Sequence, residues 1–323
     1  MGVGYVSTAV LTIPNNPFQE FSSVGFSITK AANKLITDSA PGASAISTGY
    51  RINYLSIAVD TSSYPIQTIF DEAEKLGLST GMVVTSSITD ATPAAFVAHV
   101  SNRKEETEIA KQFLKKRIEV VIGGGEAYFS DSILIDSMRN GLDILKEDGY
   151  EIFTDFENLK SNPPSSNFYA LLGKKHLPKT SEREYSLTDL TEIALSHLSK
   201  NESGFVLMVE GSQIDWGGHK NDQEYILSEL TDFCGAITTA LNFAKNNNTL
   251  VLVTADHETG GMSITDGKMD GSELKMKFNS TGHTAELVGV FAKGPGEELF
   301  RGVYDNYMIG RNLFHLLNPD YKF

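Results

Sequence analysis

Two segments of the chain place carboxylates and histidines at spacings that suit metal ligands. Asp215 and His219 lie four residues apart, which brings both side chains to one side of a helical turn. Asp256 and His257 are adjacent after an apolar run, and His283 stands between a glycine and a threonine. Because the chain has one cysteine, these residues predict a site built from carboxylate oxygen and imidazole nitrogen.

Two of these features have an ordinary structural explanation when each is taken alone. The Asp215/His219 pair alone reads as a solvated surface pair, and His283 alone as a turn histidine. Asp256 is different, because a carboxylate directly after a buried strand is costly unless it is paired or metal-bound. Several such segments that can converge therefore favour a metal site over separate surface groups.

A further reactive group lies in residues 37–45, which are nearly all small. Ser39 stands where the N-cap of a helix is expected, with Pro41 in the first turn. Ser39 is then either a cap on a tightly packed helix or a nucleophile at a helix N-terminus, where free N–H groups favour a phosphate. The small neighbours leave room for a substrate and metal ions, which favours the second reading.

The elements that position these groups follow an alternating pattern. Pro65 stands early in one helical pattern that Gly77 closes, and another covers residues 227–244. Continuous apolar runs, typical of strands buried on both faces, occur at residues 81–85, 118–122, 205–209, 249–255 and 287–292. The pattern predicts an α/β fold, a three-layer αβα sandwich with a largely parallel central sheet. Ligands bind beside strand ends in such folds, and the polar segments lie there.

Composition narrows the possible partners. Lysine plus arginine is 27 and aspartate plus glutamate is 41, so the formal charge is 27 − 41 = −14. This acid excess argues against a nucleic-acid surface and against docking on an anionic membrane. No apolar run reaches the roughly 18 residues of a membrane span. Cys234 falls on an apolar helix face and is expected to be a buried structural thiol.

Five motifs together resemble the alkaline phosphatase family, and they occur in the family's order. They are residues 37–49 (TDSAPGASAISTG), 90–103 (DATPAAFVAHVSNR), 210–219 (EGSQIDWGGH), 254–257 (TADH) and 281–283 (TGH). The resemblance implies a compact, bacterial-type phosphomonoesterase, with residues 1–323 as a single catalytic domain. It also implies small phosphate monoesters as substrates, a homodimer, and a periplasmic or secreted location, although the chain shows no signal peptide.

The resemblance assigns roles residue by residue. Ser39 corresponds to the nucleophile that becomes a phosphoserine, and Arg103 to the arginine that binds the substrate phosphate, with Asp38 orienting it. Trp216 is expected to shape the rim of the pocket, with core packing as its alternative. The implied metal ligands are Asp215, His219 and His283 for one zinc ion, Asp256, His257 and Ser39 for a second, and Thr92, Glu210 and Asp90, the last through a bound water, for one magnesium ion.

The chain departs from the family at its beginning, and other functions stay open. Family members open with a buried strand ending in Gly-Asp-Gly-Met-Gly, whose aspartate bridges zinc and magnesium, whereas this chain starts Met1-Gly2. We therefore expect an N-terminal truncation, open sheet edges and weak binding of the second zinc and the magnesium. The alternatives are a phosphodiesterase of the same superfamily, or a metal-binding fragment with little activity. A sulfatase is disfavoured, because no arginine follows Cys234 or Ser39 at the required spacing.

Overall fold

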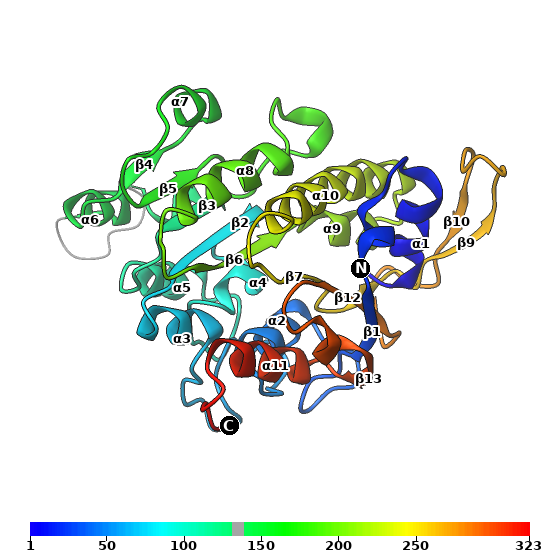
Figure 1. The fold of residues 1–323 in the computed structure, drawn as a ribbon, viewed down its shortest axis with the longest axis horizontal. Helices are drawn as coiled ribbons and strands as arrows, with labels where there is room; N and C mark the ends of the chain where they lie inside the picture. The colour runs from blue at the N-terminus through cyan, green and yellow to red at the C-terminus, as the bar shows by residue number, and fades with distance from the viewer. Residues whose placement is uncertain (131–138) are drawn as a thin grey trace.

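The computed structural model describes residues 1–130 and 139–323, and its largest sheet has five parallel strands (Figure 1). Their order is β4 (Glu151–Phe153), β5 (Phe168–Leu171), β3 (Val120–Gly124), β2 (Ser79–Ser87) and β6 (Phe205–Glu210). Along β2, Met82 and Val84 pack into one buried cluster while Val83 packs into another. The central strands are therefore buried on both faces, as the continuous apolar runs predict.

A second sheet of four strands is mixed rather than parallel. Its order is β13 (Gly302–Asp305), β1 (Ser23–Ile28), β12 (Val288–Lys293) and β7 (Val251–Val253). β1 pairs parallel to β13 and antiparallel to β12, which in turn pairs antiparallel to β7. Among the described residues, β6 and β7 are edge strands of two separate sheets.

Helices cover both faces of the five-stranded sheet, which gives the predicted three layers (Figure 1). One layer contains α8 (Leu187–Leu198) and α10 (Gln223–Ala244), and the other contains α2 (Ser39–Thr48), α3 (Ile69–Lys75), α5 (Glu106–Phe113) and α11 (Tyr307–Leu317). Shorter or peripheral helices are α1 (Val3–Thr12), α4 (Ala91–Ala94), α6 (Gly141–Glu147), α7 (Phe156–Ser161) and α9 (Gln213–His219). The 3₁₀ turns are η1 (Pro17–Glu20), η2 (Glu126–Tyr128), η3 (Thr180–Glu182) and η4 (Glu297–Phe300).

Two small antiparallel pairs complete the described structure. β8 (Glu258–Thr259) pairs with β11 (His283–Thr284), and β9 (Ser263–Asp266) pairs with β10 (Lys275–Lys277). His283 therefore lies in a strand opposite Thr259, and not in a turn. No helix in the described part of the chain is long and apolar enough to cross a membrane.

Two predicted helix starts are wrong, and each has a local cause. Helix α3 begins at Ile69, four residues after Pro65, because Thr68 and Asp71 form a reciprocal capping box. Helix α2 begins at Ser39 itself, and the N-cap is Asp38, whose side chain makes no cap hydrogen bond. The hydroxyl of Ser39 is therefore not used in capping. Cys234 is buried, as expected.

Candidate metal and phosphate site

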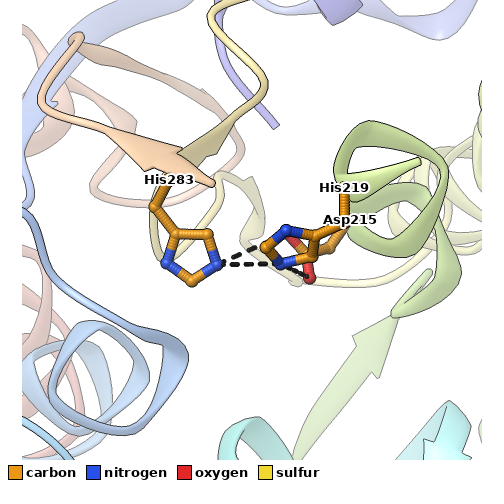
Figure 2. Close-up of side chains that lie close together, drawn as sticks. All are labelled: Asp215, His219 and His283. Carbon is orange, nitrogen blue, oxygen red and sulfur yellow. Dashed lines mark hydrogen bonds and ion pairs between the residues drawn. The ribbon is translucent and has the colours of Figure 1, made fainter. Parts of the chain in front are cut away.

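Asp215, His219 and His283 form a cluster whose ligand atoms all lie within 4.8 Å of one another (Figure 2). Helix α9 carries Asp215 and His219 four residues apart, and strand β11 carries His283. His219 Nε2 lies 3.2 Å from Asp215 Oδ2 and 3.2 Å from His283 Nε2. The structure thus brings these three sequence-predicted residues together.

The outer nitrogen of each imidazole fixes which nitrogen faces the cluster. His219 Nδ1 lies 2.6 Å from the carbonyl oxygen of Thr281, and His283 Nδ1 lies 2.8 Å from that of Thr37. A carbonyl oxygen only accepts, so each Nδ1 carries a proton. In the neutral rings both Nε2 lone pairs then point at one another beside a carboxylate, an arrangement that suits a shared cation.

The charges of this cluster also favour a cation. The hydrogen bond with Asp215 raises the pKa of His219 to about 9. Burial acts to raise the pKa of Asp215, but its hydrogen bond to His219 and the nearby His257 outweigh it and lower that pKa. A partly buried carboxylate that stays ionised in this way needs positive charge beside it, from a proton or from a metal ion.

A second cluster joins Ser39 to Asp256 and His257. Ser39 Oγ lies 3.0 Å from His257 Nε2, and Asp256 Oδ2 lies 3.2 Å from the same nitrogen. In a serine–histidine–aspartate relay the carboxylate holds Nδ1, the nitrogen opposite the serine. Here serine and carboxylate meet at one nitrogen, so the three side chains converge on a point instead of forming a relay. Carboxylate oxygen and imidazole nitrogen are both donors that zinc binds in proteins.

Thr259 links the two clusters, and sequence reasoning missed it. Its hydroxyl is buried, donates to Asp215 Oδ1 and lies 3.3 Å from His257 Nδ1. Because the single hydroxyl proton goes to Asp215, Thr259 accepts from His257 Nδ1, which leaves Nε2 of His257 facing Ser39. Tyr5 donates to the carbonyl oxygen of Thr259 over 2.6 Å. The sequence offered one indication of this role, because Thr259 is a polar residue two positions after the predicted ligand His257.

A third group is almost entirely acidic. Glu210 ends β6, and its carboxylate accepts from Ser212 Oγ over 2.6 Å and also hydrogen-bonds the Thr92 side chain. Burial, together with the negative charges of Asp256 and Asp90, raises the pKa of Glu210 to about 8. The negative carboxylates in this group repel one another unless a proton or a cation lies between them. Mg²⁺ prefers oxygen ligands of this kind. The structure thus brings Glu210, Thr92 and Asp90 to one side of the site.

Arg103 supplies the positive charge beside Ser39. Its Nη1 lies 3.2 Å from Asp38 Oδ2 and its Nη2 lies 2.6 Å from Asp90 Oδ1. Burial lowers the pKa of Arg103, but the charges of Asp90 and Asp38 outweigh it and raise that pKa. Asp38 also accepts from the N–H of Leu55 over 3.2 Å. The guanidinium is therefore held in a fixed orientation by two carboxylates, one of them on the residue before Ser39, and its remaining N–H groups can bind two oxygens of an anion.

The remaining predicted residue and the unassigned histidines lie as follows. Trp216 is half-buried next to Asp215 and packs against His176, a loop histidine for which sequence reasoning found no role. His99 bonds the carbonyl oxygen of Ala58, and His197 packs on Phe168. His315 is exposed on α11.

The family model, the relatives in sequence and the similar solved structures described below are all alkaline phosphatases. The family model described as alkaline phosphatase matches residues 12–277. Alkaline phosphatase 4 of Bacillus subtilis is 33% identical over 87% of this chain and 77% of that protein. The alkaline phosphatase from the Antarctic bacterium TAB5 has a TM-score of 0.91 and 37% identity, covering 98% of this chain and 94% of that one. A cold-active alkaline phosphatase from Shewanella sp. has a TM-score of 0.88 and 30% identity, covering 98% and 97%.

Proposed function

Since this chain belongs to the alkaline phosphatase family, we propose that it hydrolyses phosphate monoesters through a phosphoserine formed on Ser39. The observation that carries this proposal is the position of the hydroxyl. Ser39 Oγ lies 3.0 Å from His257 Nε2, and the neighbouring Asp38 holds Arg103. The nucleophile, a proposed zinc ligand and the phosphate-binding cation therefore lie together at the start of α2.

The donor sets support two zinc ions and one magnesium ion. Asp215, His219 and His283 would hold one zinc, and Asp256 and His257 with Ser39 would hold the other. Glu210 and Thr92 would hold magnesium, with Asp90 as an outer ligand. A variant of the TAB5 enzyme has a structure with Mg bound in its M3 site. When bound, such ions lower the pKa of a hydroxyl nucleophile and offset the negative charge on a leaving oxygen.

The chain's own residues bind and orient the substrate. Arg103 offers a planar pair of N–H groups to two non-bridging phosphate oxygens, and Asp38 and Asp90 keep it in place. Ser39 is the first residue of α2, where free backbone N–H groups favour a phosphate. Oγ gives up its proton to water and bonds to phosphorus as the ester oxygen departs with its electron pair and takes a proton from water. Water later cleaves the new phosphoester bond, which releases inorganic phosphate and restores the Ser39 hydroxyl. Positioning carries most of this chemistry, because the transition state is loose.

A trapping experiment tests the proposal. The protein, loaded with zinc and magnesium, is mixed with p-nitrophenyl phosphate and quenched in acid, and the Ser39 peptide is analysed by mass spectrometry. We expect phosphate on Ser39, no turnover in Ser39→Ala, and unchanged turnover in Ser62→Ala, an exposed matched control. Phosphate absent from Ser39 during turnover would refute the covalent step. Faster cleavage of bis-p-nitrophenyl phosphate than of the monoester would favour the phosphodiesterase alternative.

The resemblance also supports proposals on size and location. We propose that the whole chain acts as one catalytic unit, because the ligands come from segments between Ser39 and His283. A homodimer and a periplasmic or secreted location are proposed on the family resemblance alone. Sedimentation of the purified protein tests the dimer, and fractionation of the source cells tests the location.

A further inference from the structure

The tryptophan beside the metal cluster has an aromatic partner that the proposed chemistry does not use. Trp216 is the single tryptophan of the sequence and follows Asp215 directly. The His176 ring packs against its indole with centroids 4.6 Å apart and planes at 74°, an edge-to-face contact. Trp216 is half-buried and His176 is exposed. The pair therefore lies at the surface beside the site, and not in the hydrophobic core.

The loop that carries His176 is fixed to the rest of the molecule. A Cβ on Gly124 would lie 2.3 Å from the carbonyl oxygen of Lys175, so glycine is required for this close approach. The N–H of Leu177 donates to the carbonyl oxygen of Thr85 over 3.2 Å. Gln213, on the same helix as the tryptophan, donates to the carbonyl oxygen of Leu177 over 2.8 Å. The loop and helix α9 are thus joined independently of the aromatic contact.

The orientation of His176 is also set by a hydrogen bond toward the site. The N–H of Ser87 donates to His176 Nδ1 over 2.9 Å, so the ring proton lies on Nε2 in the neutral imidazole. The carbonyl oxygen of Ser87 accepts from the N–H of Asp90, the residue that pairs with Arg103. One short path of bonds therefore connects the aromatic pair to the phosphate-binding arginine.

An indole carries no charge that could stabilise a bound phosphate. Any contact that it makes with a substrate must therefore be with the alcohol part of the ester. We propose that Trp216, held in position by His176, stacks against planar leaving groups and makes the site prefer phosphate esters of aromatic alcohols. This inference rests on the proposed function. Trp216 is the group that contacts the ligand, whereas His176 is a positioning residue that acts through the indole. Aromatic contacts of this kind change affinity by roughly three- to tenfold.

Non-hydrolysable ligands separate this preference from turnover. Phenylphosphonate and methylphosphonate differ in the planar group alone, and their inhibition constants are measured on the metal-loaded protein. Because the sequence has one tryptophan, its fluorescence reports whether the phenyl ring reaches Trp216. The variants are Trp216→Ala, His176→Ala and His176→Phe, with His315→Ala, at an exposed position of helix α11, as a control.

We expect phenylphosphonate to bind wild type more tightly than methylphosphonate and to alter the fluorescence, which methylphosphonate leaves unchanged. Trp216→Ala should lower the affinity ratio roughly three- to tenfold, while affinity for inorganic phosphate stays the same. His176→Ala should lower it in part, and His176→Phe, which keeps a ring but loses the hydrogen bond from Ser87, should give a ratio between those of His176→Ala and wild type. An unchanged ratio in Trp216→Ala, with phosphate still bound, would refute this inference alone. No phosphate binding and no hydrolysis of any ester would instead refute the proposed function, and this inference with it.

Discussion

Replacing Thr259 by valine tests the link between the two proposed metal-binding clusters. The exchange keeps the shape of the buried side chain but removes the hydroxyl that donates to Asp215 and accepts from His257. Asp215 then loses the bond that orients its carboxylate, and His257 is free to turn its protonated nitrogen toward Ser39. Loss of an outer-shell partner of this kind lowers metal affinity roughly 10- to 100-fold, or about 1.4–2.7 kcal/mol.

The assay is a competition titration of metal-free protein with zinc and a chromogenic chelator. Because Thr259 touches a ligand of each cluster, both zinc affinities should fall in Thr259→Val, whereas Thr259→Ser keeps the hydroxyl and should retain them. Thermal unfolding of the metal-free proteins checks that the fold is intact. If Thr259→Val binds two zinc ions within about twofold of wild type, the hydroxyl does not set the ligand geometry and the reasoning fails.

Three further predictions follow from the site. Arg103→Lys should raise the inhibition constant of inorganic phosphate roughly tenfold, because an ammonium group cannot make the two parallel hydrogen bonds that a planar guanidinium makes. An unchanged constant would contradict this. Gly42→Ala should lower zinc affinity and activity despite the better helix propensity of alanine, because a Cβ there would lie 2.7 Å from the Asp256 carbonyl oxygen and push α2 away; the check is a zinc titration with a melting curve. In metal-free protein, the free energy of unfolding should fall between about pH 5 and pH 8, because folding raises the pKa of Glu210 from 4.5 to about 8 and the folded state keeps a proton that the unfolded state has lost. Glu210→Gln should flatten that fall in urea titrations with chelator, and an equal slope would argue against it.

The side chains proposed to bind metal or phosphate could be predicted from the sequence. The backbone groups that orient those side chains could not. Asp256 and His257 follow an apolar run directly, so their place at a strand end could be foreseen. The carbonyl oxygens of Thr37 and Thr281 fix two imidazoles, yet a carbonyl group has no sequence signature. The role of His176 could not be predicted, because its contact with Trp216 depends on the conformation of its loop. Hydrogen bonds and the close approach of the loop to Gly124 set that conformation.

The first residue of a helix was harder to predict than the helix itself, because neighbouring sequence features favour different starting points. Pro65 favoured an early helix start, but the capping box at Thr68 satisfies the free N–H groups and begins α3 later. The apolar runs predicted strands at the right places, including 249–255 around β7. They carried no information on which strands pair, so the division into two sheets at β6 and β7 became visible only in the structure.

That division has a consequence for how the molecule holds together when metals are removed. Glu210 ends β6 and Asp215 follows it, while Asp256 and His257 follow β7, and among the described residues no ladder joins the two strands. The proposed metal ligands therefore come from both sheets, so bound ions would join the two sheets where no hydrogen-bonded ladder does. Hydrogen exchange at β6 and β7 amides should then accelerate on chelation more than at the central strand β3, which makes metal occupancy a determinant of local opening as well as of chemistry.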